Sequence, residues 1–126
     1  MDIIFDTSIW IEYLKGKSEY FDNCQLLLER GQVKTVEVIF AELLQGALNK
    51  REIELIKDYY KLVPKLEIDD LFILAGEFSC KEKLLSKGIG LIDSFIITAT
   101  IKSNSKLWTL DKKIKSFLDP SYLFQV

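Results

Sequence analysis

The chain has 126 residues, of which 17 are basic and 19 acidic, so its formal net charge is −2. Hydrophobic residues make up 48% of the chain, which can supply a core for one domain over residues 1–126 and excludes an intrinsically disordered protein. The absence of histidine excludes mechanisms and zinc sites that depend on this residue. Cys24 and Cys80 stand alone and are expected to be small buried side chains rather than a disulfide.

The apolar runs of the chain are short. They are far below the roughly 18 residues that a membrane span needs. No positively charged stretch precedes the first apolar run, so no secretory signal is recognisable. We therefore expect a cytoplasmic protein with no membrane association.

Short apolar runs alternate with amphipathic segments along the chain. Strands are expected at residues 3–5, 33–36, 66–68, 106–109 and 122–125. Helices are expected at residues 9–14, 20–30, 37–49, 52–62, 70–86, 91–102 and 112–117. Thr7 and Ser8 are placed to cap the first helix. This alternation predicts an α/β fold with a central parallel, twisted sheet flanked by helices on both faces.

Asp93 is an ionisable side chain in an otherwise apolar helix. It is the only charged residue between residues 91 and 101, where a carboxylate is costly unless it is paired, coordinated or open to a cleft. Its place in the first helical turn offers a second interpretation, because the positive end of a helix stabilises an anion by roughly 0.3 to 1 kcal/mol. Asp93 is therefore either part of a site or a capping acid.

Three further acids are individually weak candidates. Glu42 forms a narrow polar stripe with Gln45 and Asn49, which taken alone is most simply the solvent-facing side of a helix. Asp6 and Asp111 each come just after an expected strand. An aspartate in that position is more often a turn residue or a helix cap than a catalytic group.

The predicted topology brings these acids together. Parallel strands end at one edge of a sheet, where the following helices start and where α/β proteins place their sites. Asp6, Asp93 and Asp111 are expected at this edge. Glu42 lies about 7.5 Å along its helix, but helical side chains lean back toward the N-terminus, so it can reach the same cleft.

Clustered carboxylates require neutralisation. Two unit charges about 4 Å apart repel by roughly 4 kcal/mol at an effective dielectric constant near 20, so such a cluster is partly protonated or holds cations. An oxygen-only set suits Mg²⁺ or Mn²⁺ better than zinc or copper. Ions of this kind activate water and stabilise the charge that develops on a phosphodiester during hydrolysis, without any histidine.

Four sequence blocks resemble the motifs of a known family. They are Asp-Thr-Ser-Ile-Trp-Ile-Glu-Tyr-Leu at 6–14, Ala-Glu-Leu-Leu-Gln-Gly-Ala at 41–47, Gly-Leu-Ile-Asp-Ser-Phe-Ile-Ile-Thr-Ala-Thr at 90–100 and Leu-Trp-Thr-Leu-Asp-Lys-Lys at 107–113. Their order and spacing are similar to those of PIN domains, especially the VapC toxins of bacterial and archaeal toxin–antitoxin pairs. The resemblance implies a single PIN-like nuclease domain that cleaves RNA with Mg²⁺ or Mn²⁺. It also implies a homodimer that a small antitoxin inhibits.

The resemblance also implies roles for particular residues. It assigns catalysis and metal binding to the four acids Asp6, Glu42, Asp93 and Asp111. Thr7 and Thr109 match hydroxyl residues that support such acids in the family, while the simpler interpretation makes them a helix cap and a strand end.

Lysines beside the fourth acid are candidates for phosphate contacts. Without the four acids, 15 acidic side chains remain against 17 basic ones, a net charge of +2. Lys112, Lys113 and Lys115 could bind RNA phosphates, or they could form an ordinary solvated helix face. Many members of the family carry a further acid shortly after the fourth, where this chain has Lys112, Lys113 and Ile114, so the resemblance does not extend to a second metal. Trp10 and Trp108 could stack on bases but lie in apolar runs typical of a core.

Three alternatives remain open. A phospho-receiver-like signalling domain has a similar length and sheet, but here Asp69 and Asp70 follow the third expected strand as a helix start, and the first strand offers only Asp6. A non-catalytic module with a PIN-like shell would have lost an acid, and none of the four is missing. An RNA-processing PIN nuclease without an antitoxin fits the same residues.

Overall fold

A computed structural model describes residues 1–126, apart from the side chain of Ser18. Its centre is a parallel sheet of three short strands in the order β2–β1–β3. The strands are β1 (Ile3–Phe5), β2 (Val33–Lys34) and β3 (Lys106–Trp108). All residues of β1 are buried, as expected for an apolar central strand covered on both faces.

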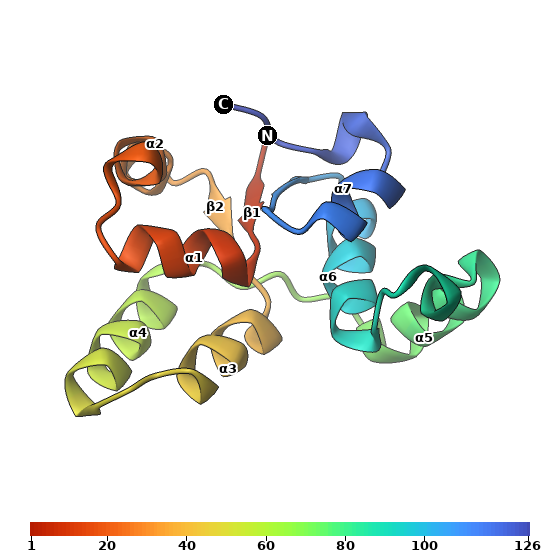
Figure 1. Cartoon of the computed structure of the whole chain (residues 1–126), viewed down its shortest axis with the longest axis horizontal. Helices are drawn as coiled ribbons and strands as arrows, with labels where there is room; N and C mark the ends of the chain where they lie inside the picture. Colours follow the sequence, from red (N-terminus) through yellow and green to blue (C-terminus); the bar gives the residue numbers. More distant parts are fainter.

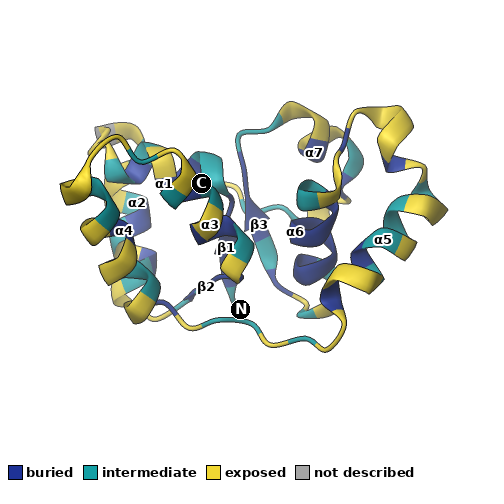
Figure 2. Ribbon diagram, turned by 90° about the horizontal axis from the view of Figure 1, so that it is seen from below, coloured by how far each residue is buried: buried dark blue, intermediate teal, exposed yellow. Residues whose placement is uncertain are grey.

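Helices α1 to α7 surround this sheet. They are α1 (Thr7–Leu14), α2 (Ser18–Glu29), α3 (Glu37–Gln45), α4 (Lys50–Leu62), α5 (Leu71–Glu82), α6 (Leu91–Lys102) and α7 (Lys112–Phe117). Figure 1 and Figure 2 both place α1 to α4 on one side of the sheet and α5 to α7 on the other. The predicted α/β fold, with a parallel sheet between two groups of helices, is therefore confirmed.

Helix α6 carries much of the core on its side of the sheet. Its residues from Ser94 to Thr100 are all buried, and its ribbon is dark in Figure 2. Asp93 immediately precedes this buried segment. None of the described helices combines the length and the hydrophobicity that crossing a bilayer requires.

Two expected strands are wrong. Residues 66–68 form no strand, and the chain meets the sheet there only through the bridge between Thr35 and Lys65. Residues 122–125 likewise form no strand, and Tyr122 ends the 3₁₀ turn Pro120–Tyr122. In each case the chain pairs with the sheet at a single bridge, Thr35 with Lys65 and Leu107 with Leu123, which an apolar run alone does not reveal.

Two helices end earlier than the sequence predicts. Helix α5 ends at Glu82 because Lys83 adopts a left-handed conformation (φ 56°), and a short 3₁₀ turn then leads to Gly88. Helix α3 ends at Gln45. Asn49 instead caps α4, since its side chain accepts a hydrogen bond from the backbone of the new helix.

The cysteines and tryptophans fall mostly in the interior. Cys24 is buried, as expected, while Cys80 is exposed, and both thiols are free. Trp10 and Trp108 are buried in the core. Neither indole therefore offers a free face to an RNA base.

Candidate active site

Asp6 lies where β1 ends and α1 begins. Its backbone N–H donates to the carbonyl oxygen of Trp108 (2.9 Å), which joins the ends of β1 and β3. Its carboxylate accepts hydrogen bonds from Thr7 N (2.9 Å), Ser8 Oγ (3.3 Å) and Thr109 Oγ1 (2.6 Å). Asp6 is itself the N-cap of α1, so the expectation that Thr7 and Ser8 cap this helix is wrong. Burial raises the pKa of Asp6 above its usual value, while these hydrogen bonds oppose the rise.

Thr109 and Asp111 shape the other strand end. Thr109 Oγ1, which donates to Asp6, also accepts a hydrogen bond from the backbone N–H of Asp111 (3.0 Å). The Asp111 carboxylate accepts one from Ile114 N (2.9 Å) and so caps α7. Both aspartates therefore serve as helix caps, as the simpler interpretation has it, and both lie at the same edge of the sheet.

Glu42 approaches this edge from α3. Its Oε1 accepts a hydrogen bond from Thr7 Oγ1 (2.7 Å), although the two residues are 35 positions apart. Glu42 is half-buried, whereas Gln45 from the same expected stripe is exposed. The solvent-facing interpretation therefore holds for Gln45 but not for Glu42.

Asp93 is half-buried in the first turn of α6. Gly90 is the N-cap of this helix, which has no side-chain capping hydrogen bond among the described residues. Burial raises the pKa of Asp93 from the usual 3.8. The negative charges of Asp6, Asp111 and Glu42 add to the rise, which brings the pKa to about 6. The other three acids are therefore close enough to act on Asp93 electrostatically.

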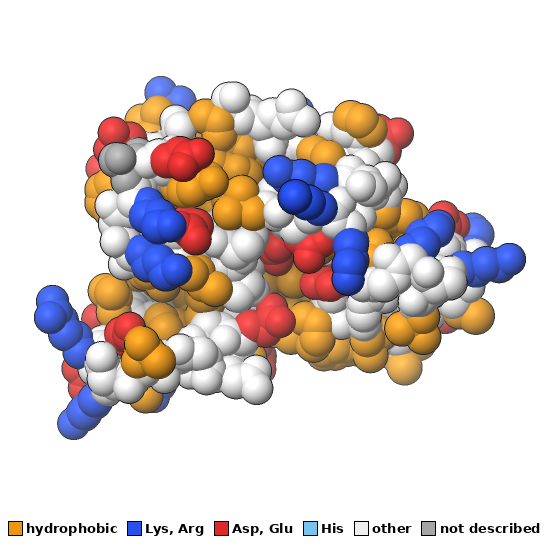
Figure 3. Space-filling model, viewed as in Figure 1, with side chains coloured by type: hydrophobic (Ala, Val, Ile, Leu, Met, Phe, Trp, Pro, Cys, Tyr) orange, Lys and Arg blue, Asp and Glu red, His pale blue; other side chains and the backbone are white. Residues whose placement is uncertain are grey.

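The acidic cluster occupies a hollow in the surface. Figure 3 shows acidic side chains between α1 and α3 on one side and α6 and α7 on the other. Within the described chain, no three Asp, Glu, Cys or His side chains come close enough together to hold a metal ion. The carboxylates are oxygen donors, the ligand type that suits Mg²⁺ and Mn²⁺, but in this structure no three of them converge on one point.

Helix α7 divides the expected phosphate-binding lysines between two hollows. Lys112 and Lys113 line one hollow together with Lys87, and Lys115 lines another beside the end of β3. The positive charge of Lys113 opposes the rise in pKa that burial causes at Asp93, so this lysine is near the acidic cluster. Sequence reasoning missed Lys87, because only the fold brings it against α7.

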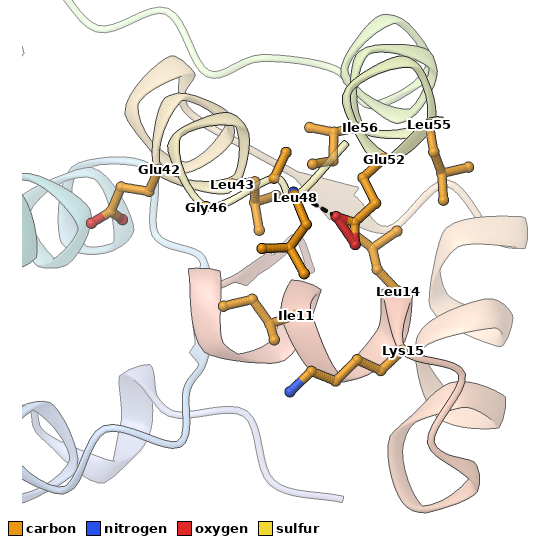
Figure 4. Close-up of a pocket in the computed structure, with 11 residues that line it drawn as sticks. Ile11, Leu14, Lys15, Glu42, Leu43, Gly46, Leu48, Glu52, Leu55 and Ile56 are labelled. Carbon is orange, nitrogen blue, oxygen red and sulfur yellow. Dashed lines mark hydrogen bonds between the residues drawn. The ribbon is translucent and has the colours of Figure 1, made fainter. Parts of the chain in front are cut away.

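An apolar hollow of about 280 Å³ borders the acidic cluster on its α3 side (Figure 4). Its apolar walls come from α1, α3, α4 and the α3–α4 connection: Ile11, Leu14, Leu43, Leu48, Leu55 and Ile56. The connection is held by a hydrogen bond from Leu48 N to Glu52 Oε2 (2.7 Å). Glu42 lies at the edge of this hollow, and Figure 4 shows its carboxylate pointing away from the apolar walls.

The fold and the site define a class of protein. A parallel sheet between two groups of helices, with carboxylates gathered where β1 and β3 end, is an α/β domain with an acidic site at the carboxyl edge of its sheet. The family model described as PIN domain matches residues 3–117. The chain therefore belongs to the PIN-domain family, and the matched segment contains all four acids.

Named proteins are similar to this chain over most of its length. It is 26% identical over 117 residues to Ribonuclease VapC32 of Mycobacterium tuberculosis, covering 90% of this chain and 88% of the relative. A chain in the structure of VapBC2 from Rickettsia felis, bound to a DNA fragment from their promoter, aligns with a TM-score of 0.75 at 22% identity and covers 99% of this chain and 98% of that one. A chain of VapBC-1 from nontypeable Haemophilus influenzae aligns with a TM-score of 0.66 at 21% identity, covering 92% and 94%. The fold is thus shared over nearly the whole chain.

Proposed function

We propose that this chain is a metal-dependent endoribonuclease that hydrolyses RNA phosphodiester bonds as the toxin of a VapBC-type toxin–antitoxin pair. One observation carries the proposal: hydrogen bonds through Thr109 and Thr7 bring Asp6, Asp111 and Glu42 together at the carboxyl edge of the sheet. Asp93, in the first turn of α6, is the fourth acid of this group. Stability alone does not favour such a cluster, since like charges in a partly buried site repel one another. Membership of the PIN family and similarity to a relative named as a VapC ribonuclease support the same conclusion.

Mg²⁺ or Mn²⁺ is the ion that we propose for this site. Its proposed ligands are the four acids Asp6, Glu42, Asp93 and Asp111. When bound, such an ion activates water and stabilises charge on the phosphodiester. Thr109 orients Asp6 and Thr7 orients Glu42 through their hydroxyl groups, so both threonines are proposed as supporting residues. Asp93, with its pKa of about 6, can hold a proton in mildly acidic solution.

A small antitoxin is the proposed protein partner. The VapBC names of the two structural neighbours support a partner of this kind. The apolar hollow of Figure 4 fits a partner segment with apolar side chains, and its border with Glu42 would lead that segment to the acidic cluster. In this proposal the chain is one nuclease domain over residues 1–126 that acts in the cytoplasm as a homodimer.

Two alternatives make different predictions. An RNA-processing PIN nuclease without an antitoxin would cut RNA but would co-purify with no small partner. A phospho-receiver-like domain is disfavoured, because residues 66–68 form no strand and Asp70 precedes α5 in a left-handed conformation (φ 57°). Neither aspartate of the pair Asp69–Asp70 therefore follows a third strand.

Cleavage of total RNA tests the proposed function. We expect fragmentation with Mn²⁺, none with EDTA, and none with Asp93→Asn, whose circular dichroism spectrum should match that of the wild type. Labelling with acetyl phosphate and Mg²⁺ covers the signalling alternative. A persistent phosphoprotein without RNA cleavage, or undiminished cleavage by Asp93→Asn, would overturn the proposal.

A further inference from the structure

A cationic hollow lies beside the acidic cluster on the side of α7. It measures about 600 Å³ and is lined by Lys87, Lys112, Lys113, Ser116 and Phe117. Lys112 and Lys113 open α7, whereas Lys87 ends the 3₁₀ turn Leu84–Lys87. All three lysines are exposed, and no acidic side chain is among the described residues that line the hollow. Two segments far apart in the sequence thus combine into one positively charged surface.

The charges of these lysines are not neutralised by ion pairs. In the part of the chain that the structure describes, the ion pairs both involve Glu12 on α1. Lys87 Nζ instead donates to the carbonyl oxygen of Glu82 (2.9 Å) and lies 5.0 Å from the centroid of the Phe117 ring. The positive charge of the hollow is therefore available to an external anion.

Lys113 connects the hollow with the acids. Its side chain lies against Gly88, where an added Cβ would be 3.2 Å from Lys113 Nζ, and Nζ is 3.5 Å from the Gly88 carbonyl oxygen. Lys113 also lies only two residues after Asp111, whose carboxylate caps the same helix. Figure 3 shows basic side chains at the rim of the acidic hollow on this side. A polyanion that approaches the acids across α7 meets positive charge first.

We propose that the hollow of Lys87, Lys112 and Lys113 binds phosphates of the RNA strand beside the bond that is cut, an inference that rests on the proposed nuclease function. An RNA strand repelled by four carboxylates needs cations close to them, and phosphate contacts supply both affinity and position. A protein segment fits the apolar hollow of Figure 4 better, because its walls are largely aliphatic. Lys115 lies outside the cationic hollow, so Lys115→Gln should weaken RNA binding less than the loss of Lys87 or Lys112.

The salt dependence of RNA binding tests this surface. The probe is a fluorescein-labelled single-stranded RNA of about 12 nucleotides, bound to protein in an Asp93→Asn background that does not cut it. The double variant Lys87→Gln/Lys112→Gln is compared with Lys57→Gln/Lys61→Gln, which removes two exposed lysines from α4 on the other side of the sheet. At roughly 0.7 per phosphate contact, the first pair should reduce the slope of log K against log [salt] by about 1.4 and weaken binding about tenfold near 0.1 M salt. The control pair should leave the slope unchanged.

Cleavage assays separate this inference from the proposed function. With Asp93 intact, Lys87→Gln/Lys112→Gln should raise KM about tenfold and lower kcat less, because phosphate contacts act in the ground state as well as the transition state. If the wild type cuts RNA but this variant binds RNA as well as the control pair does, the hollow does not bind RNA phosphates, while the proposed nuclease function is retained. If RNA binding depends on these lysines but the wild type cuts no RNA, the proposed nuclease function is wrong, while RNA binding by the hollow is supported. Loss of antitoxin binding with intact RNA binding would assign the hollow to a protein and overturn the inference.

Discussion

The acidic cluster has two sides that are built differently. The strand side consists of Asp6 and Asp111, which follow β1 and β3, and the helix side consists of Glu42 and Asp93, which lie on α3 and α6. On the strand side, Asp6 is buried and its carboxylate accepts three hydrogen bonds, the shortest (2.6 Å) from Thr109. On the helix side, Glu42 accepts one from Thr7, and Asp93 does not cap its helix. The strand side is therefore fixed by several hydrogen bonds, whereas burial and repulsion act together on Asp93.

This difference bears on the open arrangement of the carboxylates. The backbone of Asp6 is tied to β3, and Asp111 is tied to the first turn of α7, so neither can move without disturbing the sheet edge. Glu42 and Asp93 sit on helices and are held by fewer hydrogen bonds. In the proposed function, Glu42 and Asp93 are therefore the acids that would adjust their positions to hold an ion.

Asp93→Asn, on the helix side, should have the largest effect of the substitutions considered, and the quantity that it lowers is the rate of RNA cleavage. The amide keeps the shape of the side chain but lacks the charge that holds a divalent ion, and the loss of about 4 kcal/mol corresponds to a roughly 10³-fold fall in kcat/KM. Single-turnover cleavage of a defined RNA measures it, with Asp58→Asn at an exposed site on α4 as the matched control. A rate within about tenfold of wild type would contradict the proposed role of Asp93.

The strand side of the cluster could be predicted from the sequence because it depends on local patterns. The apolar runs at Ile3–Phe5 and Lys106–Trp108 each lead to an aspartate, and parallel pairing of the two strands brings Asp6 and Asp111 to one edge. Asp93 could also be recognised from the sequence, since an isolated charge in an apolar helix is unfavourable unless it is paired, coordinated or open to a cleft. These predictions needed no knowledge of how the helices pack.

The remaining contacts depend on packing between distant segments and could not be predicted. No local pattern pairs Thr7 with Glu42 or brings Lys87 beside α7. The end of α5 is a similar case: Lys83 adopts a left-handed conformation that its residue type does not favour, so the helix stops at Glu82. The helical spacing of the apolar residues alone predicts a helix that continues past Glu82 to residue 86.

Thr109→Val should have the next largest effect, a loss of about 2 kcal/mol of stability on the strand side. Valine keeps the volume but removes the hydroxyl that donates to the buried Asp6 carboxylate, and hydrogen bonds to charged groups are worth roughly 1.5–3 kcal/mol. Thr98→Val is the matched control, because Thr98 Oγ1 is buried without a partner among the described residues. Its removal should leave the free energy of unfolding unchanged or higher. Chemical denaturation measures both variants, and a wild-type value for Thr109→Val would show that Asp6 does not depend on this bond.

Asp93→Asn should stabilise the fold near neutral pH. Because the folded pKa is raised from 3.8 to about 6, the native state binds the proton more tightly, and the free energy of unfolding falls as the pH rises from about 4 to about 6. A rise of this size corresponds to about 3 kcal/mol, which solvent screening of a half-buried group reduces to about 1–2 kcal/mol. Thermal unfolding in EDTA should therefore show a gain for Asp93→Asn at about pH 7.5 that disappears at about pH 3.5. An equal gain at both values would mean that the ionised Asp93 carboxylate, which burial and repulsion from the other acids disfavour, is not its source.

Thr7→Val should have the smallest effect, on the helix side. Its hydroxyl donates to Glu42, but Glu42 is only half-buried, so the lost hydrogen bond should cost less than about 1 kcal/mol of stability. The larger consequence is for cleavage, because an unoriented Glu42 should lower kcat by about tenfold. Thr7→Ser keeps the hydroxyl and should recover most of the activity. If Thr7→Val instead unfolded as readily as Thr109→Val, hydroxyl bonds would fix both sides of the cluster equally, and the contrast between a fixed strand side and an adjustable helix side would not hold.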